Sequence, residues 1–122
     1  MAKVVHFEIT AQDVARALSF YREVLGWQIT KWEGSVEYWL VSTGDESEPG
    51  INGAITPSRE NWPNTVNTID VTDLDATLNA VAANGGSIVM PRMAVPGVGY
   101  MAYCQDTEGT IFGVMESDES AA

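Results

Sequence analysis

Hydrophobic and polar residues alternate in the segment VVHFEIT near the start of the chain. Positions 5, 7 and 9 are apolar and positions 6, 8 and 10 are polar, which is typical of a half-buried strand. Apolar residues then recur at helical spacing from Val14 until Gly26, which predicts a helix of about four turns. Three further strands are predicted, at residues 27–33, 36–43 and 51–57.

The same order of elements returns in the second half. A strand at 65–71 is followed by a shorter helical pattern that ends at Gly85–Gly86, and then by strands at 87–90, 99–105 and 110–116. Residues 6–13 align with 68–75, and residues 51–55 align with 111–115. The chain therefore predicts an internal duplication within one domain. Module one is residues 1–60, module two is residues 64–117, and residues 118–122 are expected to be a frayed tail.

Polar residues at the start of each predicted helix suggest how the helices are capped. Thr10 with Asp13, and Thr72 with Asp75, have the three-residue spacing of a capping box, although Asp stands where Glu or Gln is usual. This spacing predicts Thr10 and Thr72 as the N-cap residues.

Composition narrows the classes of protein. With 122 residues, 45% of them hydrophobic, the chain can bury a core. Six basic against seventeen acidic residues give a net charge of −11, which repels phosphate backbones and anionic membrane surfaces. No apolar run approaches the roughly 20 residues of a membrane span, and no leader pattern is present. We therefore expect a cytoplasmic protein without nucleic-acid or membrane partners.

The chain has one cysteine and one histidine. Cys104 cannot form an internal disulfide, and we expect it in the core, since it has few basic neighbours to activate it. Metal sites built on cysteine pairs are excluded. His6 is left as the one imidazole for metal binding or acid–base chemistry, or as a polar residue hydrogen-bonded to its surroundings.

Three segments together resemble a known family: VHFEITAQDVARALSFYREVLGW, VTDLDATLNAVAANGG and VPGVGYMAYCQDTEGTIFGV. They are similar to the vicinal oxygen chelate superfamily, which includes glyoxalase, bleomycin-resistance proteins and extradiol dioxygenases. The resemblance implies an α+β fold in which two βαβββ modules form a curled mixed sheet. This cup would hold a small ligand, with the helices on the outside, and a homodimer is implied.

The resemblance also implies where a metal would lie. In metal-dependent members up to four positions hold the ion, on the first and last strands of each module. These positions fall here on His6, Gly53, Thr68 and Gly113, and only His6 can bind a metal. Because a catalytic divalent ion needs about three protein ligands, we predict no metal cofactor. Rescue by Glu8 and Asp70, two residues further along each first strand, is the alternative.

The predicted site is accordingly a metal-free cup. Gly53 and Gly113 would leave room at its floor for a ligand. Polar anchors and apolar walls would come from the same sheet, and the predicted ligand-binding residues are His6, Glu8, Gly53, Thr68, Asp70, Met101, Tyr103, Gly113 and Met115. The pattern leaves open whether Glu8 and Asp70 are merely solvated, and whether Tyr38 or Trp39 faces inward.

Three functions fit these predictions. The first is a glyoxalase/bleomycin-resistance-like protein that binds a small molecule without a metal, with an acidic surface that would attract a cation. The alternative is a metal-dependent lyase, isomerase or dioxygenase of the glyoxalase type. The third is an interaction module whose dimer surface binds another protein. The sequence identifies neither the ligand nor a catalytic residue.

Overall fold

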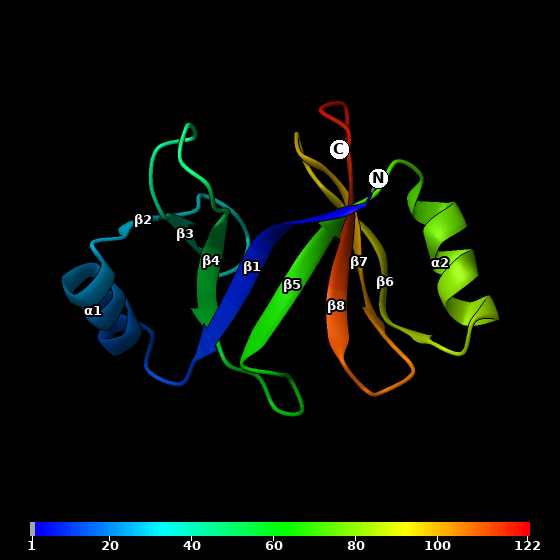
Figure 1. The fold of residues 1–122 in the computed structure, drawn as a ribbon, viewed down its shortest axis with the longest axis horizontal. Coiled ribbons are helices and arrows are strands. Elements are labelled where there is room, and N and C mark those ends of the chain that lie inside the picture. The colour runs from blue at the N-terminus through cyan, green and yellow to red at the C-terminus, as the bar shows by residue number, and fades with distance from the viewer. Residues whose placement is uncertain (1) are drawn as a thin grey trace. The chain divides into compact units, whose positions relative to one another are not determined.

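The computed structural model describes residues 2–122, and this part of the chain forms eight strands and two helices (Figure 1). Their order is βαβββ followed by a second βαβββ, which confirms the predicted α+β class and its duplicated topology. The elements are β1 (Lys3–Ala11), α1 (Val14–Leu25), β2 (Gln28–Lys31), β3 (Trp39–Ser42), β4 (Asn52–Pro57), β5 (Thr65–Asp70), α2 (Leu74–Ala83), β6 (Ser87–Val95), β7 (Gly99–Gln105) and β8 (Ile111–Ser117).

The chain divides into two compact units. We call His6–Val66 the N-terminal unit, and Asn67–Ala122 with the residues up to Val5 the C-terminal unit. In the N-terminal unit the strand order is β2-β3-β4-β1, and only β1 and β4 are parallel. In the C-terminal unit the order is β5-β8-β7-β6, and only β5 and β8 are parallel. Each unit therefore contributes four strands of mixed parallel and antiparallel pairing to the eight-stranded sheet.

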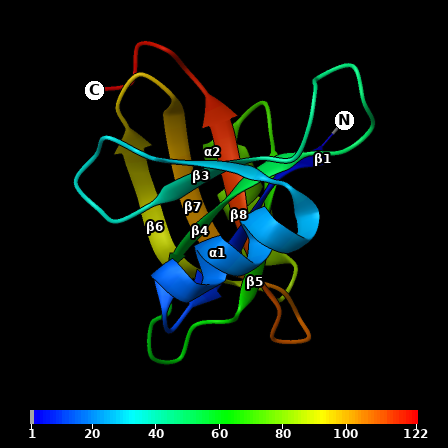
Figure 2. The same cartoon turned by 90° about the vertical axis from the view of Figure 1, so that its left-hand side faces the viewer.

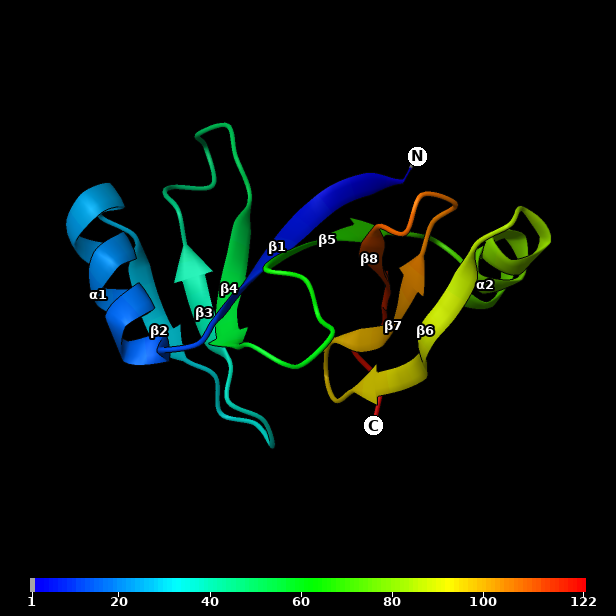
Figure 3. The ribbon, with the colours of Figure 1, turned by 90° about the horizontal axis from the view of Figure 1, so that it is seen from below.

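The strands of each unit are covered by a helix on one face. Helix α1 packs against β2 and β4 (Figure 2), and α2 packs against β6, β7 and β8 (Figure 3). Among residues 2–122, neither unit places a helix of its own on the opposite face. We call this second surface the helix-free face of each unit. Neither helix is long and apolar enough to cross a membrane.

The helices begin at aspartates rather than at the predicted threonines. Asp13 precedes α1 and accepts a hydrogen bond of 3.0 Å from a backbone amide of the first turn, and Asp73 does the same for α2. Thr10 still belongs to β1, where its hydroxyl donates to the Pro63 carbonyl at 3.1 Å. The capping predictions for Thr10 and Thr72 are wrong because only the residue next to the helix can reach its free amides.

A small apolar core lies under each helix. The buried residues under α1 are Leu18, Ile29, Val41 and Ile55. Those under α2 are Leu74, Ala102, Cys104 and Val114. The prediction that Cys104 is a core residue is confirmed, and burial raises the pKa of its thiol. Because the thiolate is the nucleophile, Cys104 is not poised for nucleophilic catalysis.

The pairing of β1 with β4 determines which face each residue occupies. In this parallel register His6 is the partner of Asn52, and Phe7 is the partner of Gly53. Paired residues of a sheet point to the same face, so Gly53 shares the helix-covered face with Phe7. The predicted position of Gly53 beside His6 on the ligand face is therefore wrong by one residue.

The surroundings of Gly53 contain no open space. A Cβ atom there would lie 2.6 Å from two ring carbons of Phe7 and closer still to the Phe7 carbonyl oxygen. Glycine is needed because the backbone of β1 and the Phe7 ring occupy the place of a side chain. The prediction that Gly53 leaves room for a ligand is wrong for the same reason.

The last residues of the chain are ordered rather than frayed. Ala121 is buried, and its carbonyl accepts a hydrogen bond of 2.9 Å from the Gly97 amide. The Asp118 amide donates to the Val98 carbonyl, also at 2.9 Å. The turn between β6 and β7 therefore supplies hydrogen-bond partners for the last residues of the chain, and the hydropathy pattern does not predict these contacts.

We predict that Gly53→Ala lowers the free energy of unfolding by at least about 2 kcal/mol, since the added methyl meets backbone that cannot move aside. Urea unfolding measures this change. Gly44→Ala is the control, because there the nearest atom is the flexible end of the Glu48 side chain at 3.3 Å. Its cost should stay below about 1 kcal/mol, since alanine restricts the unfolded chain more than glycine does. Equal costs for the two variants would contradict the observed register.

Candidate functional site

Three polar side chains form a hydrogen-bonded chain on the helix-free face of the N-terminal unit. Strand β1 places His6 and Glu8 two residues apart, and Tyr38 comes from the segment just before β3. The Tyr38 hydroxyl donates to Glu8 Oε2 at 2.7 Å, and His6 Nε2 lies 2.7 Å from the same hydroxyl oxygen. Glu8 is only 5% exposed. A buried carboxylate needs hydrogen-bond donors, and Tyr38 supplies one.

The ambiguity between Tyr38 and Trp39 is settled by this contact. Trp39 is the partner of Ile55 and packs against the core under α1. Neighbouring residues of an extended chain point to opposite faces, so Tyr38 turns toward the helix-free face and meets His6. Tyr38 therefore belongs to the candidate site, whereas Trp39 belongs to the core.

Aromatic contacts accompany this polar chain. The rings of His6 and Tyr38 are almost parallel, 11° apart with centroids at 6.3 Å, and Trp32 meets Tyr38 edge-on at 6.0 Å. Gly34 permits this position of Trp32, because a Cβ atom at Gly34 would overlap the indole ring. The site thus combines hydrogen-bonded polar groups with aromatic surface, two features of small-molecule sites.

Burial and charge act in opposite directions on His6. Removal from water lowers its pKa below the ordinary value of 6.5, and the negative charge of Glu8 opposes this effect in part. Desolvation is the larger cause, because it penalises the imidazolium more than Glu8 stabilises it. His6 is therefore a neutral imidazole at pH 7 and above.

The four family positions for a metal do not fit a divalent ion here. His6 Nε2 is engaged by Tyr38, Gly53 lies on the other face of the sheet, and Gly113 has no side chain. No group of three or more His, Cys, Asp or Glu side chains is placed to hold a metal ion within residues 2–122. The absence of a metal cofactor stays a prediction, and it is supported by this donor set.

In the C-terminal unit, the predicted residues Thr68 and Gly113 are paired between β5 and β8. A Cβ atom at Gly113 would lie 3.0 Å from Thr68 Oγ1 and 3.4 Å from the Tyr103 ring. Thr68 is buried, and Tyr103 is 8% exposed. Gly113 is therefore packed against its neighbours, and the open floor predicted there is not present.

The same helix-free face carries the predicted apolar walls. Met101 on β7 is paired with Met115 on β8 and with Met93 on β6, and all three are half-buried. Asp70 is paired with Met115 and is exposed at the end of β5. Met101, Tyr103 and Met115 thus share one apolar face with Thr68. Within each unit, the predicted ligand-binding residues therefore lie on the helix-free face. Gly53 is the exception, because it lies on the helix-covered face.

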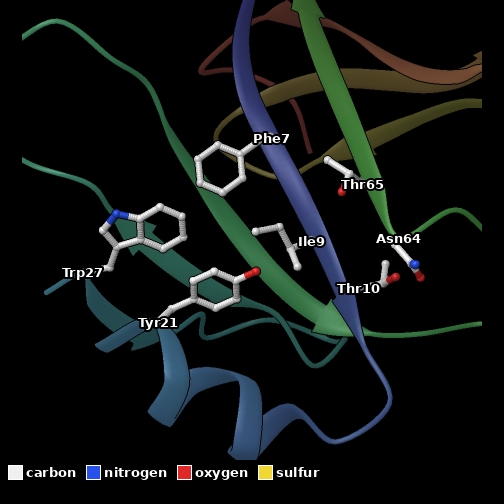
Figure 4. Close-up of a pocket in the computed structure, with 7 residues that line it drawn as sticks. All are labelled: Phe7, Ile9, Thr10, Tyr21, Trp27, Asn64 and Thr65. Atoms are coloured by element: carbon white, nitrogen blue, oxygen red, sulfur yellow. The ribbon is translucent and has the colours of Figure 1, made fainter. Parts of the chain in front are cut away.

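A pocket of about 480 Å³ opens on the helix side of the N-terminal unit (Figure 4). The rings of Tyr21 and Trp27 are stacked at 5.0 Å, and Phe7 meets Trp27 at 5.6 Å. The lining residues are Phe7, Ile9, Thr10, Tyr21, Trp27, Asn64 and Thr65. The residue pattern did not predict this pocket. Tyr21 and Trp27, which lie on either side of the helix-ending Gly26, are the aromatic residues that could have indicated it.

Comparison with known proteins identifies the family. The model of the Glyoxalase/Bleomycin resistance protein/Dioxygenase superfamily matches residues 3–114. The chain belongs to this superfamily. It is 26% identical to the "Probable lactoylglutathione lyase" of Vibrio parahaemolyticus, over 98% of this chain and 94% of that protein. It is 31% identical to the protein CFP32 of Mycobacterium bovis, over 82% of this chain but only 38% of CFP32.

Solved structures of other proteins share the fold. Methylmalonyl-CoA epimerase from Mycobacterium tuberculosis superposes with a TM-score of 0.69 at 16% identity, over 93% of this chain and 87% of that one. At this identity the likeness concerns the fold alone. The superfamily assignment made from the sequence is confirmed.

We predict that the imidazole of His6 titrates below 6.5 and that Glu8→Gln lowers its pKa further, because the variant removes the one charge that favours the imidazolium. Proton NMR measures this without assignment difficulty, since His6 is the only histidine. Because the pKa of His6 is lower in the folded protein than in the unfolded chain, the unfolded chain binds the proton more readily. The free energy of unfolding should therefore fall as the pH drops from 6.5 toward the folded-state pKa. A pKa raised by Glu8→Gln would contradict the burial argument.

Proposed function

We propose that this superfamily member binds a small organic molecule on the helix-free face of its N-terminal unit without a divalent metal. The observation that carries the proposal is the contact of His6 Nε2 with the Tyr38 hydroxyl at 2.7 Å. One nitrogen of the single histidine is hydrogen-bonded to a phenol, which is linked in turn to the buried Glu8. His6 can therefore offer an ion at most its second nitrogen, and within residues 2–122 no group of three ligating side chains is placed to complete a coordination sphere.

The groups around His6 suit recognition of a small molecule. His6 and Tyr38 are half-buried, so a ligand can reach them while part of their surface is already removed from water. Hydrogen bonds to such groups are stronger than those made at a fully hydrated surface. Trp32 and Tyr38 add aromatic surface for an apolar part of the ligand.

A metal-dependent enzyme of the glyoxalase type is the second candidate function. It is favoured by the printed name of the Vibrio relative, a lactoylglutathione lyase. That activity in this chain would require His6 to bind a metal ion, together with ligands from unorthodox positions. The two candidates differ in whether binding survives removal of divalent metal.

We expect a thermal-shift screen of small metabolites and antibiotics to find ligands that raise Tm equally with and without EDTA. His6→Ala and Tyr38→Phe should remove the shift, because each breaks the hydrogen-bonded chain. Tyr21→Phe is the matched control, since Tyr21 lies in the pocket on the other side of the sheet. Stoichiometric metal that is lost on His6→Ala, together with EDTA-sensitive ligand binding, would establish the second candidate instead.

We also propose that the protein is a homodimer. Helix α1 leaves three large apolar side chains 52–60% exposed: Phe20, Val24 and Leu25. Clusters of exposed apolar residues mark contact surfaces more often than random surface does. A symmetric dimer would cover the same patch on both copies.

Light scattering at micromolar concentration should give twice the chain mass of 13.2 kDa. Phe20→Ser should shift the mass toward that of the monomer, because it removes an aromatic ring from the patch. Ala15→Ser, at an exposed position on the same helix, is the control. A native protein of 13.2 kDa would overturn the dimer.

A further inference from the structure

The hydrogen-bonded chain around Tyr38 fixes the direction of each of its bonds. A carboxylate can only accept hydrogen bonds, and a phenol has one proton to donate. The Tyr38 proton is therefore donated to Glu8. The contact between Tyr38 and His6 Nε2 then requires that the imidazole donates.

This direction fixes the tautomer of His6. A neutral imidazole has one N–H group and one acceptor nitrogen. With the proton on Nε2, the lone pair lies on Nδ1. Among the described residues, the contact with Tyr38 is the hydrogen bond that the structure gives His6. Nδ1 is thus available to accept a hydrogen bond from a bound molecule.

The groups presented at the site therefore accept hydrogen bonds. His6 offers a lone pair at Nδ1, and Glu8 carries a negative charge behind Tyr38 at hydrogen-bond distance. The rings of Trp32 and Tyr38 add faces of negative potential, which attract cations. The proton that Tyr38 owns is already committed to Glu8. A ligand that donates hydrogen bonds complements this set better than one that accepts them.

We infer that the site is selective for organic cations with N–H groups, ammonium or guanidinium compounds whose nitrogen donates to His6 Nδ1 and whose carbon frame lies against Trp32 and Tyr38. This inference rests on the proposed function and names the ligand class of the same site. The net charge of −11 acts in the same direction, since it concentrates cations near the protein and repels anions.

The protonation state of His6 is compatible with this ligand class. Burial lowers its pKa, so the ring is neutral at pH 7 and above and does not repel a cation. Anionic ligands would meet the opposite situation. They find no uncommitted proton on His6 or Tyr38, and they approach the carboxylate of Glu8.

The tautomer is tested first, by long-range proton–nitrogen NMR on the single histidine. The native protein at pH 8 should show the pattern of an imidazole protonated at Nε2. Tyr38→Phe should change this pattern toward a mixture, whereas Tyr21→Phe should leave it unchanged. An imidazole protonated at Nδ1 in the native protein would overturn the inference, whatever the ligand experiments show.

The ligand class is tested with three probes on one benzyl frame: benzylammonium, benzyl alcohol and benzoate. We expect benzylammonium to shift the His6 signals at a concentration at least about tenfold below that needed for the alcohol, since charged hydrogen bonds are the stronger ones. Benzoate should produce no shift. Tyr38→Phe should reduce the preference for the ammonium, and Tyr21→Phe should retain it.

The outcomes separate this inference from the proposed function. Tighter binding of benzoate or benzyl alcohol at His6, insensitive to EDTA, would overturn cation selectivity while supporting metal-free binding. No perturbation of His6 by benzylammonium at about 10 mM, which corresponds to less than about 3 kcal/mol of binding, would also overturn it. Failure of every compound in the wider screen to bind without metal would remove both proposals.

Discussion

The parallel pairing of β1 with β4 is the constraint on which the candidate site depends. Phe7 lies opposite Gly53, and the ring fills the position that a side chain of residue 53 would need. A slip of one residue would move the Phe7 ring out of the core under α1 and exchange every side chain of β1 between the two faces. The match of a large ring with a glycine therefore keeps His6 and Glu8 on the helix-free face.

Glu8 is the second constraint, because a buried carboxylate without donors would be costly. The Tyr38 hydroxyl meets this need and also reaches His6. Tyr38 lies just before strand β3. Its ring contacts Trp32, and the Trp32 ring can occupy its position because residue 34 is a glycine. The Tyr38 hydroxyl thus stabilises the buried Glu8 carboxylate and also determines which hydrogen bond His6 makes.

The sequence alone predicted the elements well where a pattern and a stop signal coincided. Helix α1 ends as predicted at Leu25, since Gly26 adopts a left-handed conformation with φ of 70°. Strand β7 also has the predicted bounds. The alternation of apolar and polar residues predicted that His6 and Glu8 lie on one face of the first strand. The internal repeat predicted that Thr68 lies beside Gly113.

The errors arose where neighbouring strands or distant segments decide the outcome. An alignment of two repeats gives equivalent positions, but it does not give the pairing register, so Gly53 was placed one residue away from its actual partner. Tyr38 could not be assigned to the site, because its hydrogen bonds to His6 and Glu8 join residues 32 and 30 positions apart. The order of the chain end at Ala121 likewise depends on a turn far away in the sequence.

The burial of the single cysteine has an experimental consequence for the dynamics of the protein. Cys104 is fully buried in the C-terminal unit, so a thiol reagent can modify it only when that unit opens. His6, the single histidine, reports on the N-terminal unit in the same sample. The chain therefore carries one chemical and one spectroscopic reporter, one in each half of a duplicated fold. Comparing the denaturant dependence of the two signals shows whether the halves unfold as one cooperative body or as two.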